Sequence, residues 1–418
     1  MIKNKDISFS FLLFFIFLVS LLGYVFVYSQ KLVNQPIRSD ALGYYAYLPA
    51  FLIYHDPGMS QIEIYQPKPQ VFTYPPIYFN LKTEKYIDKY PLGVALLVLP
   101  FFILAQILSF LLVLPLTGYN FVYQHFAGIA GIFYFIAGLY FLAKLYKSYF
   151  SKKAVLFALV SLAFATNLFH YATFDSLMSH VFSFFLLSLV LYFFNKVKKF
   201  DNKKLIFLGV LIGLIFLVRN LNIILIIPFL LCFGKNRKSL ALVLVVAFLI
   251  CLPQFLYWYY VSGKLLLFSY QKEGFNLLRP NFYGVLFSPR KGLFFWAPIF
   301  LLGFLGIGEL ARKLEKLLPS FLVAIFSYIF LVASWHDWSF GASFGNRAFI
   351  DIYPLLGFFL AGFYEKASQR LGYKKIVLLL VFFIILNLTN MVKYWQQILP
   401  YDQVSLEIYL KNLFVLKK

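Results

Sequence analysis

Cysteine and charge are what this sequence has least of. Its 418 residues include two cysteines, Cys232 and Cys251, and both lie inside apolar runs. A disulfide framework is therefore excluded, and we expect both to pack as small apolar residues. Charged residues make up 13% of the chain and hydrophobic residues 62%, whereas roughly a quarter of the residues in a soluble domain are charged. No polar stretch is long enough for a separate soluble domain, so we expect one membrane domain over residues 1–418.

Several motifs of soluble enzymes are also missing. The sequence has no zinc-ligand spacing, Walker loop, dinucleotide fingerprint or G-x-S-x-G elbow. Its net charge of +22 would suit nucleic acid, but the lysines and arginines form short clusters between apolar runs. That arrangement is typical of a membrane protein, whose cytoplasmic loops are enriched in basic residues. We therefore expect no nucleic-acid partner.

Apolar runs are what the sequence has in excess, and runs of about 20 residues are long enough to cross a bilayer. The first run lacks the features of a cleaved signal peptide, so we expect an uncleaved helix with the N-terminus in the cytoplasm. The runs predict an all-α integral membrane protein with about eleven transmembrane helices, at residues 9–28, 122–146, 154–172, 180–195, 205–219, 222–233, 240–260, 293–310, 317–335, 350–365 and 375–395.

The basic clusters set the sidedness of these spans. With the clusters in the cytoplasm, residues 30–121 form one long outer loop, and the segment 92–116 cannot cross the membrane once. We predict that it dips into the outer leaflet or lies along it, with Pro91, Pro100 and Pro115 breaking or bending it. The alternative is a true crossing, which would put residues 144–153 outside. Residues 41–54 have the tyrosines and the helical spacing of a juxtamembrane helix.

Ionisable side chains are predicted to gather on the outer face. All five histidines fall there, with most of the acids and five of the eight arginines, which are Arg38, Arg219, Arg279, Arg290 and Arg347. A guanidinium group matches phosphate with a planar fork of donors. A transport path would instead favour charges at mid-membrane, where this chain has almost none. The pattern favours a site for an anionic ligand at the outer surface.

Three constellations of candidate site residues lie in the first two outer loops. Asp40 begins the juxtamembrane segment and is either a general base or an N-cap. Lys89, just before the segment 92–116, either meets a lipid phosphate or snorkels at the interface. Asp175 and His180 bound a tight turn, where they either converge on a ligand or metal ion or serve as a helix cap and a packed histidine.

Two more constellations follow in the later outer loops. Arg290 and Lys291 precede a helix whose first amides could help to bind an anion; the alternative is a pair of rim charges. The segment 335–351 combines glycines, tryptophans and charges, a mixture that a purely structural loop rarely needs. Arg347 would hold a phosphate there, Asp351 would orient it, and the flat tryptophan rings would face a sugar. The candidates in this segment are Trp335, His336, Asp337, Trp338, Arg347 and Asp351.

These motifs resemble those of the GT-C superfamily of polyprenyl-phosphate-dependent glycosyltransferases, especially bacterial proteins related to protein O-mannosyltransferases and aminoarabinose transferases. The residues that carry the resemblance are Ser39-Asp40, Gly43 to Tyr45, Lys89 to Leu92, Asp175 with His180, Ser288 to Phe294, Trp338 to Gly341, and Arg347 to Pro354. The resemblance implies a GT-C-like bundle with a catalytic acid at Asp40, a second acid at Asp175, and Lys89 near the lipid phosphate. It departs from many members at Ala41, where they have a second adjacent acid.

The function that we expect from this resemblance is a glycosyltransferase of the cell (inner) membrane. It would move a sugar from a polyprenyl-phosphate carrier to a hydroxyl or amine of a glycan, lipid or protein acceptor at the outer face, with inversion. No cofactor is assigned, and a divalent metal at Asp175 and His180 stays open. The alternatives are a lipid-linked sugar flippase or transporter, which should show internal repeats, and an envelope-assembly subunit, which would not need the segment 335–351.

Overall fold

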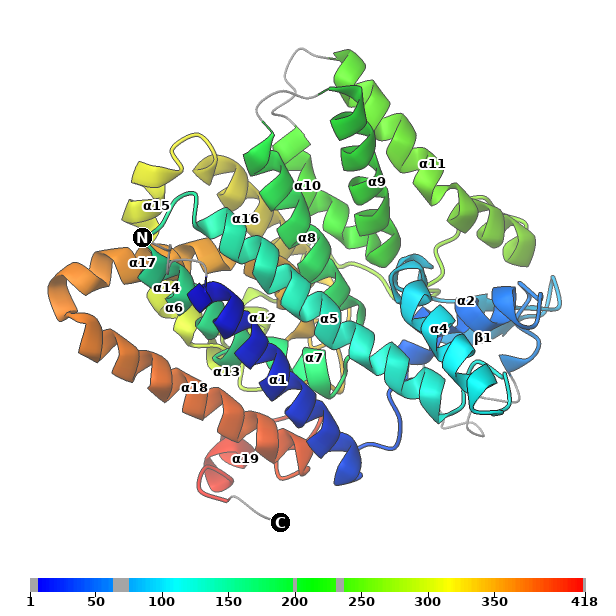
Figure 1. Ribbon diagram of the computed structural model, residues 1–418, viewed down its shortest axis with the longest axis horizontal. Coiled ribbons are helices and arrows are strands. Elements are labelled where there is room, and N and C mark those ends of the chain that lie inside the picture. The colour runs from blue at the N-terminus through cyan, green and yellow to red at the C-terminus, as the bar shows by residue number, and fades with distance from the viewer. Residues whose placement is uncertain (1–6, 63–74, 198–200, 231–236, 416–418) are drawn as a thin grey trace.

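The computed structural model describes residues 7–62, 75–197, 201–230 and 237–415, and in them the chain is a bundle of helices with one small antiparallel sheet (Figure 1). The elements are α1 (Ile7–Ser29), α2 (Asp40–Leu52), β1 (Ile77–Asn80), β2 (Lys85–Asp88), α4 (Gly93–Leu111), α5 (Phe121–Tyr146), α6 (Lys152–Phe164), α7 (Leu168–Thr173), α8 (Ser179–Lys196), α9 (Asn202–Val218), η1 (Asn220–Asn222), α10 (Ile223–Leu230), α11 (Arg237–Ser262), α12 (Phe282–Phe287), α13 (Leu293–Trp296), α14 (Ile299–Phe304), α15 (Ile307–Lys313), α16 (Leu318–Ser334), η3 (Arg347–Ile352), α17 (Tyr353–Leu371), α18 (Tyr373–Trp395) and α19 (Leu406–Lys411).

Several helices are built to cross a membrane. Within the described residues, seven are long and apolar enough: α1, α4, α5, α8, α11, η3 with α17, and α18. Residues 220–230 and α16 are shorter apolar helices. The prediction of an all-helical, multi-pass membrane protein is confirmed, but the count of eleven full spans is not.

Two predicted spans are interrupted helices. The span 154–172 consists of α6 and α7, which are separated at residues 165–167. The span 293–310 contains α13, α14 and the beginning of α15. Pro298 lies between α13 and α14, where its missing N–H and fixed φ are compatible with the start of a helix but not with a helix interior. Apolar composition alone does not show such breaks.

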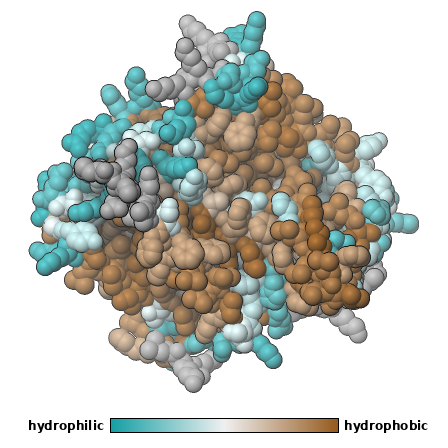
Figure 2. All heavy atoms as spheres, in the orientation of Figure 1, coloured by the Kyte–Doolittle hydropathy of each residue, from teal (hydrophilic) through white to brown (hydrophobic). Residues whose placement is uncertain are grey.

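The surface of the bundle is suited to lipid. Figure 2 shows a broad apolar area across the visible face, with hydrophilic residues towards its margins. Phe11 and Leu22 of α1, Phe110 of α4 and Phe382 of α18 are among the large side chains left exposed. An apolar surface of this extent marks a contact with lipid or with another protein, and the spanning helices that carry it favour lipid.

Small residues let two of the helices pack closely. Gly209 and Gly213 of α9 face α11, and a Cβ atom at either position would lie 2.6–2.7 Å from Val246 or Ile250. Two glycines four residues apart are a common packing motif in membrane helices. The pair α9 and α11 forms one flank of the bundle in Figure 1.

The first outer loop is more regular than the sequence predicted. The juxtamembrane segment 41–54 corresponds to α2, but most of its residues are buried rather than exposed at an interface. The segment 92–116 is mainly one continuous helix, α4, which passes through Pro100; Pro91 and Pro115 lie outside it. Of the expected break or bend, a break at Pro100 is therefore absent from this helix.

The helix α4 runs beside the first half of α5. Tyr134 donates a hydrogen bond to the carbonyl of Leu97 at 2.7 Å, and Tyr123 bonds to Gln106. The two helices are therefore antiparallel, and the start of α4 lies level with the middle of α5. The length and hydropathy of α4 suit a full span, so the re-entrant path stays a prediction.

A missing side chain lets α2 lie against the end of the β-hairpin. A Cβ atom at Gly43 would come within 2.7 Å of the Tyr90 ring and 2.9 Å of Asp88 Oδ1. That same oxygen accepts a hydrogen bond from the backbone N–H of Tyr90 at 2.9 Å. Glycine in a helix interior costs roughly 1 kcal/mol relative to alanine, so its presence here reflects the need for close packing.

Candidate functional site

The first feature of the site is an ion pair between Asp40 and Arg347. Asp40 is the first residue of α2 and Arg347 the first residue of η3, and Asp40 Oδ2 lies 2.9 Å from Arg347 Nη2. Both side chains are about one-fifth exposed, at 21% and 17%. The N-cap position belongs to Ser39, which makes no side-chain cap. The carboxylate of Asp40 is therefore directed at a cation and not at the amides of its own helix.

Backbone strain occurs directly before Asp40. Ser39 has a φ of 50° and a ψ of −131°, a left-handed conformation that an L-residue other than glycine adopts only at a cost of about 1–3 kcal/mol. Such outliers concentrate at functional sites. The strain turns the chain into α2 so that Arg38 and Asp40 project from neighbouring positions.

The second feature is Asp175, which lies in the turn between α7 and α8. Its Oδ1 is 2.6 Å from Arg38 Nη2, and its Oδ2 is 3.1 Å from His170 Nε2. Burial by itself raises the pKa of Asp175, but the charge of Arg38 and the hydrogen bond from His170 lower it to about 2. Asp175 is therefore ionised at neutral pH. We call Arg38, Asp40, Asp175 and Arg347 the paired-acid centre.

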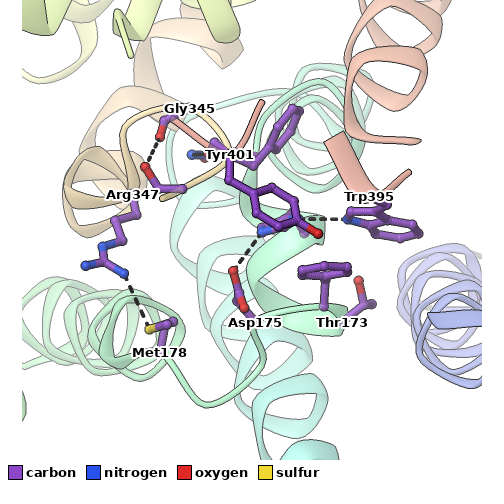
Figure 3. A network of polar contacts seen from close by, with 12 residues as sticks. Thr173, Asp175, Met178, Gly345, Arg347, Trp395 and Tyr401 are labelled. Carbon is purple, nitrogen blue, oxygen red and sulfur yellow. Dashed lines mark hydrogen bonds and ion pairs between the residues drawn. The ribbon is translucent and has the colours of Figure 1, made fainter. Parts of the chain in front are cut away.

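Arg347 connects the two halves of the paired-acid centre. Besides its contact with Asp40, its Nη1 lies 3.7 Å from Met178 Sδ, in the same turn as Asp175 (Figure 3). The charge of Arg347 also contributes to the low pKa of Asp175. The predicted grouping of Asp40, Asp175 and Arg347 on one face is thus matched by contacts between their three segments.

A third acid, Asp351, is enclosed near the start of α17. Asp351 is 1% exposed, and its two oxygens contact His180 Nδ1 at 3.2 Å, Arg219 Nε at 2.9 Å and the Tyr328 hydroxyl at 2.6 Å. Asp351 was expected to orient Arg347, but its carboxylate is occupied by these three side chains. We call His180, Arg219, Tyr328 and Asp351 the enclosed-acid cluster.

His180 belongs to this cluster and not to a site shared with Asp175. Its Nε2 lies 3.3 Å from Arg219 Nη1, and an arginine can only donate, so Nε2 accepts and Nδ1–H donates to Asp351. Asp175 and His180 therefore have separate partners. Among the described residues, no three histidine, cysteine or acidic side chains are grouped to hold a metal ion, and we assign no metal to these two residues.

Tyr44 lies four residues after Asp40 in α2 and connects this helix, through Ser179, to the enclosed-acid cluster. Its hydroxyl accepts a hydrogen bond from Ser179 Oγ at 3.0 Å, and Arg219 Nη1 donates to the same Ser179 oxygen at 3.3 Å. Burial raises the pKa of Tyr44 to about 12, against the opposing charge of Arg219. The phenol therefore keeps its proton and can donate a hydrogen bond within the site.

Lys89 is paired with a buried acid. The alternative that it snorkels, with its ammonium free at the interface, is therefore not what the structure has. It forms an ion pair with Glu273, and both residues are less than one-tenth exposed. The Lys89 ammonium lies 4.9 Å from the centre of the Tyr270 ring, and Trp335 packs edge-on against the same ring at 5.7 Å. Trp335 thus supports Lys89, while the neighbouring His336 is exposed.

Arg290 and Lys291 support a loop, and both already have acceptors within the protein. Arg290 makes two 2.9 Å hydrogen bonds to Asp402, and its guanidinium lies 5.6 Å from the Trp338 ring. Lys291 is 1% exposed and donates to the carbonyls of Ser343 and Tyr401. Burial lowers the pKa of Lys291 to about 7. The helix after them, α13, has only four residues, so it adds little to an anion site.

The loop that ends at Arg347 is held by its own polar contacts as well. Asp337 accepts hydrogen bonds from the backbone and hydroxyl of Ser339, which fixes the turn after Trp338. Gly345 has a φ of 61° and packs against Trp296. Together with the contact of Lys291 with Ser343, these interactions fix the segment that places Arg347 next to Asp40.

Several residues of the site were not among the predicted site residues. Arg219 and Glu273 belonged to the predicted outer set but had no local motif. Arg38 stood two residues from Asp40, and that adjacency was the signal that could have identified it. Tyr44 fell within the stretch that carries the resemblance and His170 among the outer histidines, but neither was singled out. Trp395, which donates a hydrogen bond to His170, ends an apolar helix and carried no signal of its own.

Comparison with known proteins supports the fold. Residues 124–258 match the model of the family described as dolichyl-phosphate-mannose-protein mannosyltransferase. This stretch runs from α5 to α11 and includes Asp175, His180 and Arg219, whereas Asp40 and Arg347 lie outside it. No curated protein matches the sequence.

A solved structure matches over most of the chain. It is ArnT from Cupriavidus metallidurans bound to undecaprenyl phosphate, with 15% sequence identity and a TM-score of 0.50. The match covers 90% of this chain but 63% of ArnT, so the chain spans less than two-thirds of the length of that relative. At this identity the likeness concerns the fold. The family model and the ArnT structure together confirm the predicted resemblance, and the chain has an ArnT-like fold.

Proposed function

We propose that this protein transfers a sugar from a polyprenyl-phosphate carrier to an acceptor hydroxyl or amine at the outer face of the membrane. The observation that carries the proposal is the paired-acid centre, in which two partly exposed carboxylates are each paired with an arginine. The family description names a lipid-phosphate sugar, and the similar ArnT structure contains undecaprenyl phosphate. The basic loops of the chain favour the outer face.

Asp40 is the general base in this proposal. It takes the proton of the acceptor hydroxyl or amine while the acceptor atom attacks the anomeric carbon. The bond between that carbon and the phosphate oxygen breaks, and polyprenyl phosphate leaves with the bonding electrons. A single displacement of this kind inverts the anomeric carbon.

Arg347 is the best-placed group to stabilise the leaving phosphate. It contacts Asp40 directly, so a phosphate bound to its guanidinium would hold the anomeric carbon next to the base. Positive charge fixed in advance where negative charge develops is a major source of catalysis. Lys89, whose ammonium lies beside the Tyr270 ring, would supply further positive charge, and Asp175 with Arg38 would align the acceptor.

The prenyl chain would lie along α4. Leu104, Ile107 and Phe110, in the second half of this helix, leave about half or more of their surface exposed. Lys89 lies four residues before the first residue of α4, at the opposite end of the helix. A lipid tail in contact with these residues would have its phosphate near the loop that carries Lys89. Arg290 and Lys291, once candidates for the phosphate, act here through the loop 335–347.

Asp40→Asn is the direct test of this proposal. Purified protein is given labelled polyprenyl-phosphate sugars, and release of free polyprenyl phosphate is measured. We expect turnover to fall by about 100-fold or more, because a general base contributes roughly 10²–10⁴-fold. Glu84→Gln, an exposed acid at the tip of the β-hairpin, is the control and should leave turnover unchanged.

Two results would contradict the proposal. Unchanged turnover in Asp40→Asn, with normal expression, would remove Asp40 from the catalytic role. Movement of the intact lipid-linked sugar across vesicles without release of polyprenyl phosphate would indicate a flippase instead.

A further inference from the structure

We propose that His170 and Trp395 are positioning residues that hold Asp175 in one orientation and charge state for the reaction. Trp395 Nε1 donates to His170 Nδ1 at 2.9 Å, and His170 Nε2 lies 3.1 Å from Asp175 Oδ2 (Figure 3). Asp175 in turn binds Arg38. A chain of hydrogen bonds therefore runs from the last residue of α18 to the paired-acid centre. The inference rests on the proposed function and extends it to two residues that touch no substrate.

The donor from Trp395 selects the tautomer of His170. An indole N–H can only donate, so Nδ1 of the imidazole must accept and cannot carry a proton. A neutral imidazole then has its proton on Nε2, where it faces the Asp175 carboxylate. Without the indole, either nitrogen could carry the proton, and the other tautomer would turn a lone pair towards the carboxylate.

His170 itself is excluded from direct acid–base work by its surroundings. The ring is fully buried, and both nitrogens are already hydrogen-bonded. Its role is therefore exerted through Asp175.

An aromatic stack keeps the chain rigid. The Phe174 ring is stacked on His170 at 5.0 Å and on Trp395 at 5.6 Å, the latter with an interplanar angle of 12°. The Arg38 guanidinium lies 5.0 Å from the centre of the Phe174 ring and donates to the Phe174 carbonyl at 3.3 Å. The same residue thus packs against both ends of the hydrogen-bonded chain, so a rotation of His170 or Trp395 would disturb Arg38 as well.

The experiment compares two tryptophan-to-phenylalanine variants in the full-length protein. Trp395→Phe keeps an aromatic ring against Phe174 but removes the N–H donor. Trp258→Phe on α11 is the matched control, because the Trp258 indole is buried and has no hydrogen-bond partner among the described residues. We expect kcat of Trp395→Phe to fall by about 10-fold, the lower end for loss of a partner that orients a functional group. The KM for the polyprenyl-phosphate sugar should stay near that of the control.

Two variants of His170 separate positioning from packing. His170→Phe keeps the ring volume and removes both hydrogen bonds, so kcat should fall at least as far as in Trp395→Phe. His170→Gln retains an N–H donor for Asp175 and should recover part of the loss. Equal kcat values in His170→Phe and the wild type, or in Trp395→Phe and Trp258→Phe, would overturn the inference.

A measurement independent of catalysis completes the test. In protein with ¹⁵N-labelled histidine, the His170 signals are identified by their absence from His170→Gln. We expect an unprotonated Nδ1 and a protonated Nε2 in the wild type, and a changed balance in Trp395→Phe. A wild-type protein with no transferase activity would refute the proposed function, but the nitrogen signals would still test the chain of hydrogen bonds from Trp395 to Asp175. Protonation of His170 at Nδ1 in the wild type would overturn that chain.

Discussion

Asp175 and Asp351 are two acids with nearly the same neighbours and different surroundings. Each carboxylate is paired with an arginine and a histidine, Arg38 and His170 in one case and Arg219 and His180 in the other. The Asp175 and Arg38 side chains are 13% and 32% exposed, while Asp351 and Arg219 are 0% and 16% exposed. The same three residue types therefore form part of an accessible centre in one place and an internal brace in the other.

The remaining partner explains the difference between the two acids. Tyr328 covers the remaining side of Asp351 with a hydrogen bond, and its hydroxyl oxygen also lies 3.0 Å from the carbonyl oxygen of Ala348. This fastens α16 to η3. The arginine beside Asp175 remains partly open, so one side of that ion pair can meet a ligand. The residue types around the two carboxylates do not distinguish the two roles, whereas the solvent exposure of the side chains does.

Of the variants that test this comparison, Asp351→Asn should have the largest effect, which is a loss of stability. Removing one charge from a buried ion pair typically costs about 3–5 kcal/mol, because the other charge stays buried without compensation. The midpoint of thermal unfolding in detergent should therefore fall sharply. Asp201→Asn, which breaks an exposed pair with Lys204, should leave the midpoint unchanged. Equal midpoints for the two variants would mean that the enclosed-acid cluster does not brace the fold.

A smaller effect, dependent on pH, is expected at Asp175. Its folded-state pKa of about 2 lies below the ordinary value, so its ionised form stabilises the protein above the unfolded-state pKa near 4. This contribution, about 2 kcal/mol, is lost as the pH falls from about 4 towards 2. Asp175→Asn should therefore unfold at a lower temperature than the wild type at pH 7, and the gap should narrow at pH 3. A gap that stays constant across this range would contradict the ionised pair.

The smallest effect should come from Arg38→Lys. Lysine keeps the charge but lacks the planar fork, so it cannot contact Asp175, the Phe174 carbonyl and the Phe174 ring together. We expect a loss of a few-fold in kcat with no change in the unfolding midpoint. Arg290→Lys serves as the comparison, because Arg290 is equally exposed but is paired with Asp402, outside the paired-acid centre. A larger loss of kcat in Arg290→Lys than in Arg38→Lys would mean that the functional arginine is Arg290 and not the one beside Asp175.

Helix positions could be predicted well where length and hydropathy decide them. The predicted spans 122–146 and 375–395 end within two residues of α5 and α18. A break of a helix within an apolar run, as at Ala165 to Asn167, could not be predicted, because apolar residues on both sides conceal the break. The burial of α2 could not be predicted either, since it depends on α4 and the hairpin that cover this helix.

The site could be predicted only in part, and for a similar reason. Charge distribution placed Asp40, Asp175 and Arg347 on one face, and contacts between their segments agree. Their partners depend on packing between distant helices: Arg38 is 137 residues from Asp175, and His180 is 171 residues from Asp351. No local spacing encodes such pairs. Trp395 is the extreme case, since it ends an apolar helix like any other interfacial tryptophan.

Gly43 has a consequence for the chemistry although it has no functional group. The hydrogen at its Cα lies where α2 meets the end of the hairpin that leads into Lys89. One methyl group there would act as a spacer and force the two segments apart, and the proposed base would move away from the lysine although both were unaltered. The alignment of two charged groups thus depends on an atom that the chain omits.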